Sequence, residues 1–275
     1  MKEILLCNDD GVKSSGILAA NEAVKDLGNT TIVAPSVQQS GIGHALTLFE
    51  PIRINKEKLI NGKIGYSVSG TPTDSLIVGV FEILNKKPDL VISGINIGYN
   101  LGKAELTTSG TLGAAIESAS YGIPTIAVSQ AVTNESTKFE NGHININFDF
   151  TIKILRKLSK YVLNNGLPDG VDLINLNVPS NPKSDEVKIA RLTERMFIPE
   201  VETRYDPRGK PYYWIDGIVT DNDEKGTDGY YVKNKNITTI TPVSIDLTGN
   251  LNKTEEWFKD FYGMDGYNED DEILF

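Results

Sequence analysis

The sequence predicts an α/β fold, a Rossmann-like three-layer sandwich in which helices cover both faces of a mainly parallel sheet. Two observations support this. Short apolar runs alternate with segments of helical period through most of residues 1–180, and tight polar loops follow several of the runs. Repeated strand–helix units of this kind form parallel sheets with helices on both sides. Beyond residue 180, short β-like pieces and polar turns replace the alternation, so we expect a β-rich C-terminal extension there.

The predicted strands are short runs that end at turn residues. The first, residues 4–7, is apolar throughout and is followed by Asn8-Asp9-Asp10-Gly11, which suits a buried strand and a tight loop. Residues 46–69 lack helical period and contain turn signals, so we expect an antiparallel excursion there. Further strands are expected at residues 30–34, 89–93, 125–129, 172–178, 210–218 and 237–245.

The predicted helices begin at capping residues. Ser14 or Ser15 caps the first helix, whose apolar residues recur on one face until Gly28. Thr71 as N-cap, followed by Pro72, starts a helix that runs to about residue 84. It is apolar nearly all round, which predicts burial. Further helices are expected from residue 109 to about 121, from 147 to 164 and from 251 to 262.

We expect a core domain at residues 1–180 and an extension of β-hairpins and a terminal helix at residues 181–275.

Composition narrows the classes of protein that fit. The net charge of −10 argues against a nucleic-acid partner held by a basic surface. The single cysteine, Cys7, excludes an internal disulfide and fits a reducing compartment. No stretch approaches the ~20 apolar residues of a membrane span, so we expect a cytoplasmic protein that does not contact a membrane.

Polar side chains gather in the loops that follow three predicted strands. Asp9 and Asp10 follow the first strand, Ser40 follows the second, and Asn96 follows the strand at residues 89–93. Ligands of open α/β sheets bind outside the carboxyl ends of the strands, so we expect these four side chains at one edge. All are oxygen donors, which Mg²⁺, Mn²⁺ or Ca²⁺ prefer, whereas Zn²⁺ usually prefers nitrogen or sulfur.

The adjacent aspartates need a turn before both can reach one ion. Successive side chains of an extended strand point to opposite faces. Gly11 makes a turn easy, and a divalent cation would relieve the repulsion between Asp9 and Asp10. The alternative is a plain loop in which an aspartate caps the next helix.

Other polar residues have both a binding and a structural interpretation. Ser109-Gly110-Thr111 opens a helix whose free N–H groups suit a phosphate, or it is an ordinary N-cap. Asn100 reaches a phosphate oxygen or holds its own glycine-rich loop. His44 and His143 are too few for a multi-histidine zinc site. His44 is either an incidental loop residue or a group that protonates a leaving group.

Motifs spread over roughly residues 3–248 resemble, in the same order, those of the SurE family of 5′/3′-nucleotidases. They are Asn8-Asp9-Asp10-Gly11, Ala34-Pro35 with Gln39-Ser40-Gly41, Ser69-Gly70-Thr71-Pro72-Thr73-Asp74, Ser93-Gly94-Ile95-Asn96-Ile97-Gly98-Tyr99-Asn100-Leu101-Gly102, Ser109-Gly110-Thr111, Asp206-Pro207-Arg208-Gly209-Lys210-Pro211-Tyr212-Tyr213-Trp214, and Ile240-Thr241-Pro242 with Asp246-Leu247-Thr248. Residues 103–108 depart from the family pattern, which bears on loop shape and substrate preference.

The resemblance implies one Mg²⁺ or Mn²⁺ ion per subunit, with the ligands Asp9, Asp10, Ser40 and Asn96. It implies a homodimer or homotetramer in which C-terminal segments are exchanged. We therefore predict a metal-dependent phosphomonoesterase, a 5′/3′-nucleotidase resembling an acid phosphatase, that dephosphorylates nucleoside 5′- or 3′-monophosphates. Asp9, Asp10 and Asn96 are its predicted catalytic residues. The predicted phosphate-binding residues are Asn8, Gly41, Asn100, Ser109, Gly110 and Thr111.

Two rival functions fit parts of the same sequence. A covalent aspartyl-phosphate phosphatase is one, but the dehalogenase-like pattern needs two aspartates separated by one residue, and here they adjoin. The other is a nucleotide-binding module without hydrolysis. Its glycine-rich fingerprint should follow the first strand, whereas Gly41 and Gly43 follow the second and no third glycine occupies position 46.

Overall fold

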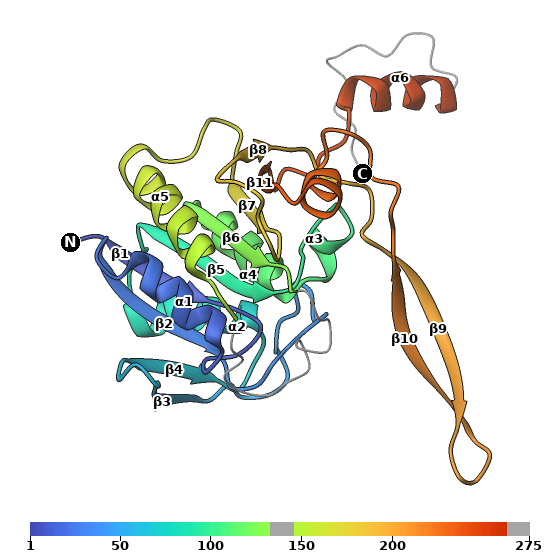
Figure 1. The fold of residues 1–275 in the computed structure, drawn as a ribbon. Helices are drawn as coiled ribbons and strands as arrows, with labels where there is room; N and C mark the ends of the chain where they lie inside the picture. The colour runs from blue at the N-terminus through green and yellow to red at the C-terminus, as the bar shows by residue number, and fades with distance from the viewer. Residues whose placement is uncertain (133–145, 263–275) are drawn as a thin grey trace. The chain divides into compact units, whose positions relative to one another are not determined.

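The structure is a computed structural model that describes residues 1–132 and 146–262. The chain divides into two compact units, Met1–Val243 and Ser244–Phe275. The first contains the sheets (Figure 1). In the second, helix α6 (Leu251–Tyr262) is amphipathic, and the ring of Trp257 stacks on that of Phe261 with 5.5 Å between centroids.

The central sheet has nine strands in the order β3-β4-β2-β1-β5-β6-β7-β11-β8. All neighbours from β4 to β7 run parallel, whereas β3 is antiparallel to β4 and β11 to β7. The Rossmann-like, mainly parallel prediction is thus confirmed, as is the antiparallel excursion. The strands are β1 (Glu3–Cys7), β2 (Asn29–Pro35), β3 (Ile54–Lys58), β4 (Ile64–Val68), β5 (Leu90–Ile97), β6 (Thr125–Gln130), β7 (Leu173–Val178), β8 (Val187–Ile189) and β11 (Thr238–Val243).

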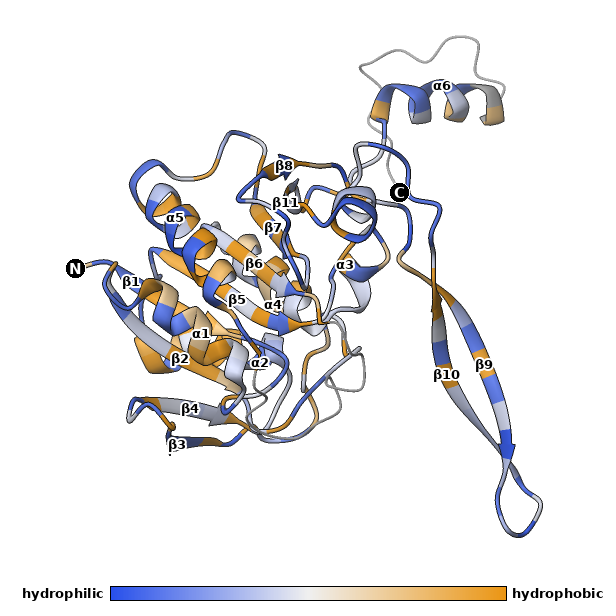
Figure 2. Cartoon of the chain, in the orientation of Figure 1, coloured by the Kyte–Doolittle hydropathy of each residue, from blue (hydrophilic) through white to orange (hydrophobic). Residues whose placement is uncertain are grey.

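Helices cover both faces of this sheet. On one face α1 (Ser15–Val24) packs beside α5 (Asp149–Asn165), and on the other α2 (Pro72–Val78) packs beside α4 (Gly110–Ser120). Alternate residues of each strand point to opposite faces, so there are two apolar clusters. Leu6 belongs to the cluster under α1 and α5, and Leu5 to the cluster under α2 and α4. The central strands are accordingly largely hydrophobic in Figure 2.

Helix α1 lies unusually close to β5. Its N-cap is Ser14, one of the two predicted caps, and its first turn contains Gly16. A Cβ atom added at Gly16 would lie 1.9 Å from the carbonyl oxygen of Ile95. Only glycine therefore allows the two backbones to approach this closely.

Gly16→Ala should lower the melting temperature, because helix or strand must move to admit the methyl group. Overpacking of this kind costs about 1–3 kcal/mol, and each kcal/mol lowers the Tm of a chain this size by about 2–4 °C. Thermal unfolding followed by circular dichroism measures the change. Gly249→Ala is the matched control, since its added Cβ would meet nothing within 4 Å. Equal Tm values for both variants would contradict the close packing.

The helix predicted from Thr71 to residue 84 has two parts. Thr71 and Asp74 form a capping box at the start of α2, which confirms the structural cap. The continuation is a π-helix, η1 (Gly79–Leu84). The prediction that the whole helix is buried is wrong for part of η1, because Phe81 and Glu82 are exposed, whereas Gly79 and Val80 are buried. Phe81 is 56% exposed, and its ring packs edge-on against that of Tyr121.

Strand β5 runs four residues further than predicted, to Ile97, and therefore includes Asn96. The pairing with β6 shifts register between Ser93 and Asn96. Gly94 lies at this shift with φ 133°, a backbone conformation that favours glycine. Asn96 is thus held at the end of a paired strand rather than in a loop.

Beyond residue 180 the chain forms a separate hairpin and also adds two strands, β8 and β11, to the central sheet. Strands β9 (Phe197–Tyr205) and β10 (Pro211–Val219) form an antiparallel hairpin, with a turn in which Asp206 accepts hydrogen bonds from two backbone N–H groups. The run of Tyr212, Tyr213 and Trp214 by itself predicts aromatic side chains of the core and of an interface. On β10 all three are exposed, so the core role is wrong, and the interface role stays a prediction. Because β8 and β11 join the central sheet, the division at residue 180 also stays a prediction. The acidic tail at residues 263–275 lies outside the described residues.

Among the described residues, no helix combines the length and the apolar character needed to cross a membrane.

Candidate active site

The loops after β1 and β2, the end of β5 and the start of α4 meet at the carboxyl edge of the parallel strands. Asp9 contacts the start of α4, and Asp10 contacts the end of β5. The loop after β2 reaches Asp9 through a backbone hydrogen bond of 2.8 Å from Gln39 N to the Asp9 carbonyl. The same loop reaches the last residue of α3 (Glu105–Thr108), which directly precedes the cap of α4, because Gly43 N donates to the Thr108 carbonyl at 2.9 Å. The predicted edge is therefore formed.

Asp9 is buried against the first turn of α4. Its side chain accepts a hydrogen bond from Thr111 Oγ1 at 2.5 Å. A Cβ atom added at Gly110 would lie 2.9 Å from Asp9 Cβ, which shows how closely the helix approaches. Burial raises the pKa of Asp9, and hydrogen bonds from the Thr111 side chain and backbone oppose this rise. A cation beside Asp9 would offset the cost of burying its charge.

Asp10 links β5 to the loop that contains Ser40. Its Oδ2 accepts from Ile97 N at 3.2 Å, and its Oδ1 accepts from Gln38 Nε2 at 3.4 Å. The same amide nitrogen donates to Ser40 Oγ at 2.9 Å. The oxygens of Asp10 and Ser40 therefore converge on one positively polarised group. Gln38 was missed in the sequence, although its place beside the Gln39-Ser40-Gly41 motif was a signal.

Asn8 is fully buried within its own loop. Its Nδ2 donates to Ser14 Oγ at 2.7 Å, and its Oδ1 accepts from Gly11 N at 3.2 Å. Gly11 has φ 98°, so the tight turn predicted for this loop is present. Asn8 thus shapes the loop that presents the two aspartates, and its contact with phosphate stays a prediction.

The predicted phosphate-binding residues differ in their exposure. Gly41 is exposed, as is the neighbouring predicted metal ligand Ser40, whereas the start of α4 is buried. Ser109 caps α4, because its Oγ accepts from Leu112 N at 3.3 Å. Thr111 directs its hydroxyl to Asp9. The N-cap interpretation of this motif is therefore present in the structure, and its binding of phosphate stays a prediction.

Asn96 and Asn100 occupy the strand end and the loop after it. Asn96 is partly buried, and its Nδ2 lies 3.4 Å from the Gly98 carbonyl. Asn100 is buried, and its Nδ2 donates to Ser129 Oγ at 2.8 Å. The side chain of Asn100 thus ties its loop to β6, and its contact with phosphate stays a prediction. Ser129 was missed in the sequence, since nothing local distinguishes a serine in a strand.

His44 lies against Glu117, on the second half of α4. Its Nε2 lies 2.6 Å from Glu117 Oε2 on the far half of α4. Glu117 also accepts a hydrogen bond from the Tyr121 hydroxyl. This bond and burial raise the pKa of Tyr121 to about 12, with burial the larger cause. Protonation of a leaving group by His44 stays a prediction, and His143 lies outside the described residues.

The donor set fits a hard cation. Residues 1–132 and 146–262 contain no group of three or more His, Cys, Asp and Glu side chains that could hold a metal. A cation here would therefore need the neutral oxygens of Ser40 and Asn96 besides the carboxylates of Asp9 and Asp10. Such an all-oxygen set suits Mg²⁺ or Mn²⁺ better than Zn²⁺.

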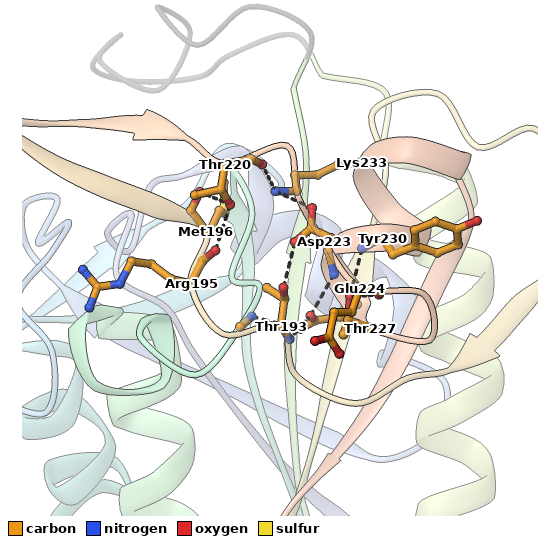
Figure 3. A network of polar contacts seen from close by, with 12 residues as sticks. Thr193, Arg195, Met196, Thr220, Asp223, Glu224, Thr227, Tyr230 and Lys233 are labelled. Carbon is orange, nitrogen blue, oxygen red and sulfur yellow. Dashed lines mark hydrogen bonds and ion pairs between the residues drawn. The ribbon is translucent and has the colours of Figure 1, made fainter.

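A second polar network holds the end of the loop after β5. Asp228 is fully buried and accepts from Gly102 N at 3.0 Å and from Thr193 N at 2.7 Å. Beside it, Lys233 Nζ lies 2.7 Å from Asp223 Oδ2, and both side chains are at least 90% buried. Thr193 and Lys233 both point toward Asp223 in Figure 3. Burial is the main cause that raises the pKa of Asp228.

Comparisons with known proteins point to one family. The family described as "Survival protein SurE" matches residues 4–198. A protein of Methanobrevibacter smithii named 5′-nucleotidase SurE is 56% identical over 93% of this chain and 99% of its own length. Another of that name from Methanothermobacter thermautotrophicus is 56% identical over 82% of this chain and 84% of its own length. The solved structure of the SurE protein from Aquifex aeolicus has a TM-score of 0.75 and 38% identity, and the match covers 94% of this chain and 99% of that one.

Fold and site together define a Rossmann-like α/β protein with an acidic, oxygen-rich site at the carboxyl edge of its sheet. The family match and the relatives place it further: the chain belongs to the SurE family.

Proposed function

We propose that this protein hydrolyses the phosphomonoester bond of nucleoside 5′- and 3′-monophosphates with the help of one Mg²⁺ or Mn²⁺ ion. One observation carries the proposal: Asp9 and Asp10, adjacent in sequence, are anchored to α4 and to β5 and so face one edge of the sheet. The name 5′-nucleotidase SurE of the relatives supports the substrate class. The same proposal extends to 3′-monophosphates, because the proposed ion and the start of α4 would bind the phosphate group, which both kinds of nucleotide carry.

Asp9, Asp10, Ser40 and Asn96 would hold the ion. When bound, it would polarise a phosphoryl oxygen and lower the pKa of a bound water. Thr111 fixes the orientation of the Asp9 carboxylate, and the backbone N–H of Ile97 fixes that of Asp10. The start of α4 supplies a positive helix end that favours an anion at this edge.

We also propose a cytoplasmic homo-oligomer that exchanges C-terminal segments. Its partners would be small nucleotides, without nucleic acid or membrane. Burial raises the pKa of the single cysteine, Cys7, which suits an unreactive thiol in a reducing compartment. Exposed apolar side chains on β10, such as Trp214 and Ile215, suit contacts with another subunit.

The test is a phosphate-release assay on the purified full chain with 5′-AMP and 3′-AMP. Chelation followed by dialysis should abolish turnover, and added Mg²⁺ or Mn²⁺ should restore it. Undiminished turnover after exhaustive chelation would overturn the metal-dependent scheme. Binding of AMP without phosphate release would favour the binding module, and acid-stable labelled phosphate on the protein would favour an aspartyl-phosphate.

A further inference from the structure

Polar side chains form a row across three neighbouring strands beside the proposed site. In the sheet register Asn96 of β5 pairs with Ser129 of β6, and Ser129 pairs with Asn177 of β7. Residues paired in this way project from the same face of a sheet. Ser129 and Asn177 are fully buried. The row therefore extends from a proposed metal ligand into the interior.

Asn177 binds the backbone of the loop that follows β5. Its Oδ1 accepts from Asn100 N at 3.0 Å, and its Nδ2 donates to the Asn100 carbonyl at 3.0 Å. One side chain thus satisfies both backbone groups of one residue. Asn175 adds a single hydrogen bond to the same carbonyl at 2.8 Å. Residue 100 is therefore fixed in position and in the orientation of both of its peptide groups.

Asn100, the residue held by Asn177, lies between the two ends of the loop that follows β5. Asn96 is four residues before Asn100, and Gly102, two residues after it, is held by Asp228. The Asn100 side chain is directed to Ser129, which is the register partner of Asn96. A shift of the Asn100 backbone would consequently be passed to the strand end where Asn96 lies.

Stability alone does not require an amide at position 177. A buried asparagine in a strand must satisfy every donor and acceptor that it brings, and a well-packed apolar residue would avoid that demand. An apolar residue could not form hydrogen bonds with the backbone of the loop. The geometry points to a role of Asn177 in holding the loop after β5 in position.

We propose that Asn177 is a positioning residue for the hydrolysis proposed above, on which this inference rests. It does not touch the substrate. It holds the Asn100 backbone, and through it the segment from Asn96 to Asn100, in which Ile97 N donates to Asp10.

The test variant is Asn177→Asp, which has nearly the same shape. It keeps the acceptor for Asn100 N but places an oxygen against the Asn100 carbonyl where Nδ2 was. We expect kcat for AMP to fall about 10–100-fold, the range found when residues that orient metal ligands are changed, with KM altered less than about threefold. The Mn²⁺ concentration for half-maximal activity should rise, because the proposed ligand Asn96 is displaced. A direct Mn²⁺ titration by electron paramagnetic resonance, done in the absence of substrate, should show that N177D binds Mn²⁺ more weakly than the wild type does.

The pH profile provides a rescue that a merely structural role would not give. As the pH falls, the carboxylic acid form of N177D regains a donor for the Asn100 carbonyl, so its kcat should approach that of the wild type at the same pH. Asn175→Ala is the matched control, two residues along the same strand, and removes only one of two hydrogen bonds to that carbonyl. It should lower kcat less than N177D does, at a comparable loss of Tm.

Each outcome decides one point. If the wild type releases phosphate and N177D matches its kcat and Mn²⁺ binding, the positioning role is overturned and the proposed function stands. Equal effects of N177D and N175A, without pH rescue, would also overturn it. If the wild type hydrolyses no nucleotide with any metal, the proposed function itself fails. Should N177D not fold, Asn177→Ser carries the same kcat and Mn²⁺ test, since a serine cannot span both backbone groups.

Discussion

Asp9→Asn should lower kcat/KM for AMP by about 10²–10³-fold or more, since loss of one preorganised electrostatic group already has that effect. The carboxylate is only 4% exposed and is the most deeply buried charge of the proposed ligand set. An amide in its place has almost the same shape and still accepts from Thr111, but it provides no charge for a cation. Phosphate release at saturating Mg²⁺ or Mn²⁺ measures the loss.

The fold should survive this change. Burial raises the pKa of Asp9, so the folded state disfavours its charge. A neutral amide removes that penalty, and the Tm of Asp9→Asn should equal or exceed that of the wild type. Asp26→Asn is the control: Asp26 pairs with Arg156 on the surface, and its loss should leave turnover intact. An Asp9→Asn enzyme that keeps more than about a tenth of wild-type kcat/KM would contradict the assignment of the site.

Asp228→Ala should produce the largest loss of stability. Asp228 accepts hydrogen bonds from the backbone N–H groups of Thr193, Gly102 and Gly229, at 2.7, 3.0 and 2.8 Å. Alanine would leave all three donors buried without a partner. Each such group costs about 1–3 kcal/mol, so we expect the three together to lower the free energy of unfolding by roughly 3–9 kcal/mol. Urea unfolding followed by fluorescence measures it, and Asp221→Ala, at an exposed neighbour, should change little.

The effect of Asp228 should also depend on pH in a defined direction. Its pKa is raised in the folded state, chiefly by burial. A carboxyl with a raised pKa stabilises the fold most below its unfolded value, near 4, where both states are protonated. That contribution declines as the pH rises through the folded pKa. The stability difference between wild type and Asp228→Ala should therefore be larger at pH 4 than at pH 7.5. A larger difference at pH 7.5 would show that the three N–H groups outweigh burial.

The sequence by itself determined the layers of this protein and the edge at which its chemistry lies. Apolar runs separated by helical segments specify a parallel sheet, because each unit must bury its apolar face on the next. Caps at Ser14, Thr71 and Ser109 were predictable, since a capping side chain binds an N–H only three residues away. Asp9 and Asp10 were placed at the right edge for a related reason: parallel strands all end on the same side.

Only the tertiary structure decided which distant groups hold that edge in place. Asn100 and Asn177 are 77 residues apart, and Gly102 and Asp228 are 126 apart. The register shift in β5 that places Asn96 within the strand depends on β6, and the insertion of β11 beside β7 brings a strand from far along the chain into the sheet. Local patterns extend over a few residues, because caps, turns and alternation are interactions between near neighbours. Contacts across a hundred residues depend on how whole layers pack and on strand register, which no short segment encodes.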